Sequence, residues 1–275
     1  LSEYDVGEIK AYRAEGDKKT PGDFFALVCQ RHLIPRRKIQ GVYKNFMSPH
    51  LVPLQAGKTF FWPPDGQERF ILIYKNTLGK RLLQPDKKAA AGLKPDLVIE
   101  AVVRPLINVL QDFRDKDVVH GAIRATNMYD GGTRAKDMKV VLGDCLSVPA
   151  SYAQPALYES VHRAMADPIG RGPGSLSDDL YSFGVSLAVL IRNNDTTSHL
   201  SDQELIQQKI ERGTYPLLLS KDRIQSGITD LIRGLTHDDP HERWTLDDVM
   251  QWAAGTRINP KQSLLHKKAA RYVVF

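Results

Sequence analysis

The sequence predicts an α+β fold with a small, β-rich N-terminal lobe and a larger, helical C-terminal lobe. In the first third of the chain, short apolar runs alternate with turn-forming residues, whereas beyond residue 80 apolar side chains recur at helical spacing. The 275 residues, 42% of them hydrophobic, suffice for two lobes with a substantial core. The expected division is an N-terminal lobe at 1–74, a hinge at 75–80, a C-terminal lobe at 81–260 and a tail at 261–275 that leads to a further domain.

The N-terminal lobe contains two predicted pairs of strands. The first pair covers residues 7–13 and 24–29, with Gly and Pro among the residues between them. The second pair covers residues 58–62 and 69–74 and is joined by Pro-Pro-Asp-Gly at 63–66. Proline and Asp-Gly between two apolar runs are typical of a hairpin, so we expect these two strands to pair directly.

The predicted helices carry recognisable start and stop signals. A short helix is expected at 36–46, and Pro95 begins a longer one in which Pro105 is expected to introduce a kink. Residues 178–194 are apolar on nearly every face, which is typical of a helix buried on all sides. Two later helices each begin with a capping box and end at a glycine. The boxes are Ser201-x-x-Glu204 and Thr245-x-x-Asp248, and the glycines are Gly213 and Gly255.

The composition narrows the classes of function. The longest apolar run, 181–191, has about half of the ~20 residues that a membrane span requires. The only two cysteines, Cys29 and Cys145, form neither a disulfide framework nor a zinc motif, which favours free core thiols in a cytoplasmic protein. The +6 net charge is spread over small basic groups without interleaved aromatic residues. This pattern predicts a solvated basic surface rather than a nucleic-acid site.

Three C-terminal motifs occur in the order in which eukaryotic-type protein kinases carry them. Residues 155–159, Pro-Ala-Leu-Tyr-Glu, resemble the segment that ends in A-P-E, and residues 179–185 resemble D-x-x-S-F-G-V. Residues 239–245 resemble D-P-x-x-R-P-T. The resemblance covers nearly the whole chain and implies a bilobal, kinase-like fold. It implies structural roles for three residues, namely a buried pair of Glu159 with Arg243, and Asp179 at the start of the long buried helix.

The same resemblance identifies a degenerate catalytic loop at 120–127. Kinases carry H-R-D-L-K-P-x-N there, and this chain carries His-Gly-Ala-Ile-Arg-Ala-Thr-Asn. Ala122 replaces the aspartate that accepts the substrate proton, a function worth roughly 10²–10⁴ in rate. Arg124 replaces the lysine and would keep a cation for the γ-phosphate, whereas His120 is expected to be structural. Asn127 keeps one of the two metal ligands.

The second metal ligand of the family is represented by Asp144. The D-F-G motif reads Asp-Cys-Leu at 144–146, so the residues that flip in active kinases are absent. The resemblance implies that Asn127 and Asp144 hold the Mg²⁺ or Mn²⁺ of a bound ATP, since hard oxygen ligands suit Mg²⁺. The alternative is that Asp144 only caps a turn at the surface.

The nucleotide contacts of the N-terminal lobe are further degraded. The anchoring lysine of the family is replaced by Val28 or Cys29, depending on the register, and its partner glutamate is missing near residues 38–40. The glycine-rich loop is represented at most by Gly7. The residues that the resemblance would still place against a nucleotide are Val28, Cys29, Ile73 at the gatekeeper position, Lys75 in the hinge, and Arg124.

The leading functional hypothesis is a catalytically inactive kinase-like module, a pseudokinase. It would act in signalling as a scaffold or regulator that binds another protein or an adjacent domain of the same chain. The first alternative is a divergent phosphotransferase that holds a metal–nucleotide complex through Asn127 and Asp144. The second is a nucleotide sensor without turnover that uses the same two residues. Fold alone decides none of these.

Overall fold

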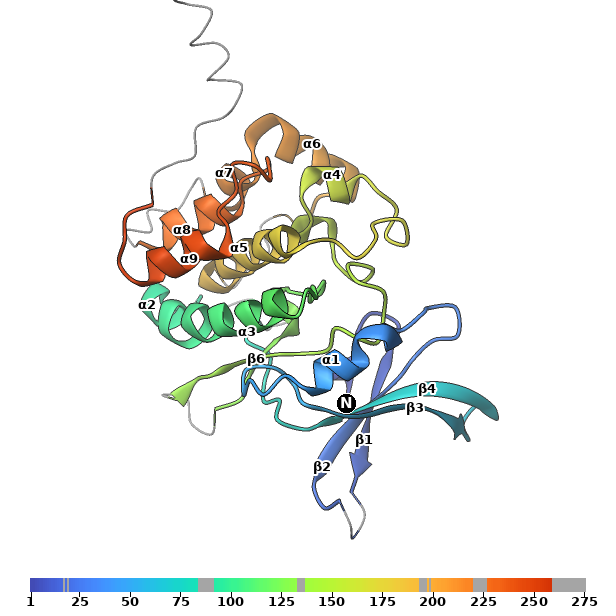
Figure 1. Cartoon of the computed structure of the whole chain (residues 1–275). Coiled ribbons are helices and arrows are strands. Elements are labelled where there is room, and N and C mark those ends of the chain that lie inside the picture. Colours follow the sequence, from blue (N-terminus) through green and yellow to red (C-terminus); the bar gives the residue numbers. More distant parts are fainter. Residues whose placement is uncertain are drawn as a thin grey trace, which may run out of the picture.

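The computed structural model describes residues 1–16, 18, 20–83, 92–132, 137–192, 197, 199–219 and 227–258. The fold is mixed, with a small antiparallel sheet and several helices, which agrees with the α+β class. Figure 1 shows the four-stranded sheet at one end of the molecule and most helices at the other. The predicted tail at 261–275 lies outside the described residues. None of the described helices is both long and apolar enough to span a membrane.

The sheet has the strand order β1-β2-β4-β3, and every neighbouring pair is antiparallel. The four predicted strands are confirmed with shifts at their ends: β1 is Lys10–Glu15, β2 is Asp23–Val28, β3 is Leu54–Trp62 and β4 is Gln67–Lys75. The predicted hairpin at 63–66 is also confirmed. It turns at Gly66, whose φ of +68° favours glycine and whose amide donates to the Trp62 carbonyl at 3.0 Å.

The two faces of the sheet pack against different surroundings. Because side chains alternate along a strand, β2 and β4 divide their residues between the faces. The inner face packs on the main core through Phe25, Leu27, Leu72 and Tyr74. The outer face carries a separate small cluster of Ala26, Val28, Ile71 and Ile73 with Trp62. This alternation decides which predicted site residues face the interior.

The first helices match their predicted positions. Residues 36–46 form a 3₁₀ turn, η2 (Arg37–Ile39), followed by α1 (Gln40–Lys44). The helix that begins at Pro95 runs through α2 (Pro95–Val98), a π-helical turn η3 (Ile99–Val103) and α3 (Arg104–Asp115). Pro105 has no amide proton to donate to residue 101, and the helix widens just before it, so that the Arg104 amide bonds the Ile99 carbonyl. The disturbance expected at Pro105 takes the form of this π turn.

The remaining elements form a short hairpin and a helical layer. They are β5 (Met128–Asp130), β6 (Val140–Leu142), α4 (Val161–Ala164), α5 (Leu176–Arg192), α6 (Asp202–Arg212), α7 (Thr214–Leu219), α8 (Ile228–Leu235) and α9 (Leu246–Ala253). Every residue of α5 from 179 to 190 is buried, as predicted. Both predicted capping boxes are present at Ser201 and Thr245. One cluster of buried apolar side chains extends from the inner face of the sheet to α3, α5, α8 and α9.

Candidate functional site

The predicted catalytic loop and the Asp144 segment meet in the interior between the sheet and the helices. Pairing of β5 with β6 sets Met128 opposite Leu142, which brings Asn127 next to the residues that follow β6. The Asn127 Nδ2 donates to the carbonyls of Asp144, at 3.0 Å, and Ala122, at 2.9 Å. The structure therefore brings Ala122, Asn127 and Asp144 together, and it buries all three.

The Asp144 carboxylate is enclosed by hydrogen-bond donors of the protein. The Tyr74 hydroxyl donates to Oδ1 in a short hydrogen bond, and the Leu146 amide donates to the same oxygen at 3.0 Å. Ser147 donates to Oδ2 from both its amide, at 3.1 Å, and its hydroxyl, at 2.5 Å. Asp144 is 3% exposed. Both carboxylate oxygens thus accept hydrogen bonds from the protein, and the carboxylate caps a buried turn rather than one at the surface.

Tyr74 reaches Asp144 because it lies on the inner face of β4. Its ring stacks on Phe25 at 5.3 Å and lies edge-on to Tyr43 at 6.5 Å. Burial, together with the nearby Asp144 charge, raises the pKa of Tyr74 well above its ordinary value of 10.0. The phenol is therefore neutral and remains a hydrogen-bond donor to Asp144 across the physiological pH range.

The residues predicted to contact a nucleotide do not line one site. Cys29 and Arg124 are buried in the interior, whereas Val28 and Ile73 belong to the cluster on the outer face of the sheet. Lys75, at the end of β4, is exposed. Ile73 and its neighbour Tyr74 lie on opposite faces of β4, because successive side chains on a strand alternate, and it is Tyr74 that faces the interior.

The N-terminal segment fills space between the sheet, the hinge residues and β5. Tyr4, in the short 3₁₀ helix η1 (Ser2–Tyr4), is 7% exposed. Its ring lies between Phe25, at 5.0 Å, and Tyr129, at 5.5 Å. Its hydroxyl donates to the carbonyl of Leu78, in the predicted hinge, at 2.7 Å. The Tyr4 ring therefore lies in the interior beside Leu78, in the segment predicted as a hinge.

His120 and Asp179 hold the start of the catalytic-like loop. The amides of His120 and Gly121 donate to the two Asp179 oxygens at 2.6 and 2.8 Å, which ties the loop to α5. Burial raises the pKa of Asp179 to about 6, and these two amide bonds oppose that shift. Burial lowers the pKa of His120 to about 3, with further lowering from Arg36 and Arg124. A neutral, buried His120 is consistent with the structural role expected for it.

Arg36 is a site residue that the sequence did not reveal. Its guanidinium donates to the carbonyls of Val119 and His120, both at 2.7 Å, and Cys145, at 3.0 Å. It therefore fastens the catalytic-like loop to the segment after β6. In the sequence it belongs to a basic Arg-Arg-Lys group, which predicted a solvated surface, and no local pattern separates it from its neighbours.

Glu159 is paired with a different arginine from Arg243, the partner that the resemblance implied. Glu159 instead pairs with Arg163, whose Nε lies 2.8 Å from Oε2. Arg163 lies in α4, four residues further along the chain, whereas Glu159 lies in the extended segment before that helix. The Arg243 guanidinium donates to the carbonyls of His237 and Ser177, both at 2.9 Å. Both predicted residues are buried and structural, but they act through different partners.

A buried lysine occupies the neighbourhood of Glu159. The Lys209 ammonium donates to the carbonyls of Ala156, Leu157 and Glu159 at 2.8, 2.9 and 2.7 Å. Its Nζ also lies 5.3 Å from the ring centroid of Tyr181. Burial lowers the pKa of Lys209 to about 7, against the charges of Asp238 and Glu159. Lys209 thus closes the segment 156–159 onto α6.

The cysteines and the acidic residues do not form a reactive or metal-binding centre in the described part of the chain. Cys29 and Cys145 are buried, free thiols. Burial raises the pKa of Cys29 to about 12 and raises that of Cys145 as well, so neither is a ready nucleophile. Among the described residues, no three His, Cys, Asp or Glu side chains are grouped as metal ligands would be.

Comparison with known proteins identifies no relative of this chain. No protein-family model matches the chain, and no curated protein matches its sequence. The interior site, which comprises Ala122, Asn127 and Asp144 with their hydrogen-bond partners, contains buried polar groups that bond to other groups of the protein.

Proposed function

We propose that the chain is a catalytically inactive, kinase-like domain with a bilobal fold, a pseudokinase. It works by binding another protein or an adjacent domain and acts as a scaffold or regulatory module in signalling. The order of a sheet, a hinge and a helical region supports this fold, as does the order of the three C-terminal motifs. The absence of a proton acceptor at Ala122 supports the lack of catalysis.

The observation that carries the proposal is the enclosure of the Asp144 carboxylate. A metal–nucleotide complex would have to displace the donors from Tyr74, Leu146 and Ser147. Each buried donor left without an acceptor costs about 1–3 kcal/mol. Tyr4 would also have to leave its position between Phe25 and Tyr129. Asp144, which would bind the metal in a kinase, here accepts a hydrogen bond from Tyr74 and so links the sheet to the segment after β6.

The proposal is tested by thermal unfolding with ATP, ADP and GTP, each with Mg²⁺, Mn²⁺ or EDTA. We expect no change in the melting temperature under any of these conditions. A nucleotide at 100 times its Kd would add about 2.7 kcal/mol of stability. That increment corresponds to several degrees, at roughly 2–4 °C per kcal/mol for a domain of this size. A metal-dependent increase that is lost in Asp144→Asn would contradict the proposal and support a phosphotransferase or nucleotide sensor.

A further inference from the structure

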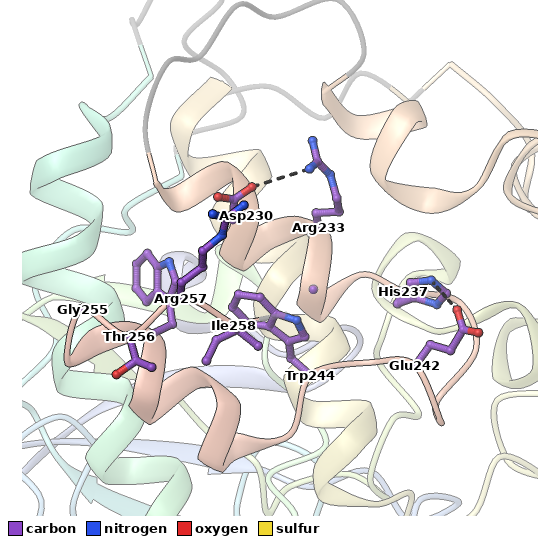
Figure 2. Close-up of a pocket in the computed structure, with 11 residues that line it drawn as sticks. Asp230, Arg233, His237, Glu242, Trp244, Gly255, Thr256, Arg257 and Ile258 are labelled. Atoms are coloured by element: carbon purple, nitrogen blue, oxygen red, sulfur yellow. Dashed lines mark ion pairs between the residues drawn. The ribbon is translucent and has the colours of Figure 1, made fainter. Parts of the chain in front are cut away.

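A pocket of about 510 Å³ lies between α8, α9 and the residues that follow α9 (Figure 2). We call it the α8–α9 pocket. Its volume is within the range of ligand-binding sites in proteins, roughly 300–1,000 Å³. In Figure 1, α8 and α9 lie in the helical part, away from the four-stranded sheet, so the pocket is separate from the interior site.

Two tryptophans form the aromatic wall of this pocket. Trp244, in the segment before α9, is 8% exposed, and its amide donates to the Gly234 carbonyl at 2.9 Å. A Cβ atom at Gly234 would lie 2.2 Å from the Trp244 indole. The indole therefore lies against the backbone of α8 at a position that only glycine permits. Trp252, on α9, is half-buried and lines the same pocket.

Most charged residues around the pocket already have partners. The Arg233 Nη1 lies 3.6 Å from the Asp230 carboxylate, and the His237 Nε2 lies 3.0 Å from Glu242; Figure 2 marks both ion pairs. Arg233 is also held over the ring of Tyr215, at 4.7 Å. These side chains form a polar rim.

Arg257 differs from the other charged residues of the pocket. It is exposed, and it forms no ion pair with any of the described residues. Among the described residues that line the pocket, Arg257 therefore offers a guanidinium that is not engaged in an ion pair, and it lines the pocket together with the two indoles. A ligand with complementary chemistry carries a negative charge beside an apolar, preferably aromatic, group.

We infer that the α8–α9 pocket binds a segment of a partner protein in which an aromatic side chain stands next to a carboxylate. The aromatic ring packs on the indoles of Trp244 and Trp252, and the carboxylate pairs with Arg257. An aromatic centre with a polar rim is the anatomy of protein interfaces, in which Trp and Arg carry much of the binding energy. This inference rests on the proposed binding function and specifies the chemistry of the partner.

The test is selection of a random peptide library, displayed on phage, on the full chain. We expect the enriched peptides to carry Phe, Tyr or Trp flanked by Asp or Glu. Their Kd values, measured by fluorescence anisotropy, should rise roughly tenfold in Arg257→Glu and in Trp252→Ala, since a contact of this kind is worth 1–2 kcal/mol. Arg257 is exposed, so its substitution should leave the melting temperature unchanged.

The matched control is Arg212→Glu, which makes the same charge change at an exposed position of α6 outside the pocket. Binding should be unaffected by this variant. Enrichment of no peptide, of peptides that lack the acidic and aromatic residues, or of peptides that bind Arg257→Glu equally well would overturn the inference. A further outcome would also overturn the inference: no peptide is enriched, but benzoate quenches tryptophan fluorescence in a way that depends on Arg257. The pocket would then be a small-molecule site. A nucleotide-dependent thermal shift would instead refute the proposed function and leave the peptide result to stand by itself.

Discussion

The interior site and the α8–α9 pocket contain similar kinds of side chains but use them differently. In the interior, Tyr74 and Ser147 donate hydrogen bonds to the Asp144 carboxylate. The Tyr4 side chain lies beside Leu78, in the segment predicted as a hinge. In the pocket, Arg233 and His237 contact the acidic residues of the rim, and the described residues leave a pocket of about 510 Å³ next to two indoles. Residue type alone therefore does not identify a site. The distinction is whether the chain itself already satisfies the groups that would bind a ligand.

Replacement of Asp144 should have the largest effect on stability. Asp144→Ala leaves the buried donors of Tyr74, Leu146 and Ser147 without an acceptor, and we expect the free energy of unfolding to fall by about 3–5 kcal/mol. Urea denaturation measures this change. Tyr74→Phe removes one donor only and should cost about 1.5–3 kcal/mol. A loss below 1 kcal/mol in Asp144→Ala would mean that the carboxylate is available to a ligand, and the contrast with the pocket would disappear.

A glycine-to-alanine pair tests how the pocket wall is built. In Gly234→Ala the new methyl group would overlap the Trp244 indole, and we expect a loss of about 1–3 kcal/mol from overpacking. The control is Gly41→Ala on α1, where no atom lies within 4 Å of the added Cβ. That variant should gain about 0.5–1 kcal/mol, because alanine is the better helix former. Equal effects of the two substitutions in chemical denaturation would show that Trp244 is not fixed against α8.

The sequence predicted the fold better than it predicted the site. Strands, helices and capping boxes were recovered because alternation, helical spacing and terminal signals are local properties of the chain. The sequence also shows directly that alanine, which cannot accept a proton, stands at position 122. The inward position of Tyr74 was not, because a strand gives no local sign of which face is buried when both of its faces are apolar.

Long-range choices between equivalent partners were equally hidden. The resemblance implied Arg243 as the partner of Glu159, whereas the structure pairs Glu159 with Arg163. Arg36 reads as a surface residue and becomes a clamp only when the loop at 119–120 is packed beside it. The position of the Trp244 indole requires a glycine at 234, ten residues earlier. The sequence around either residue alone does not predict this contact.

Lys209 allows a more sensitive test of whether the chain itself satisfies its buried polar groups. Its ammonium is buried and donates to three backbone carbonyls. Its pKa is lowered by burial from 10.5 to about 7, so between these values the unfolded chain binds more protons at this group than the folded protein does. The contribution of Lys209 to stability therefore rises as the pH is raised from about 7 towards 10.5, by at most about 1.4 kcal/mol per pH unit. Unfolding of the wild-type chain and of Lys209→Met, measured at intervals of half a pH unit, should diverge in this direction.

The same substitution at exposed Lys44, on α1, should leave the pH profile of the wild-type chain unchanged. A flat difference between the wild-type chain and Lys209→Met would mean that the three carbonyl bonds keep the ammonium protonated through the whole range. In that case the three acceptors, and not burial, decide the protonation state of Lys209. The hydrogen bonds of this buried ammonium would then stabilise its charge more than burial destabilises it. A buried polar group whose partners are supplied by the chain itself, like Lys209 or Asp144, would in that case be held in place by those partners.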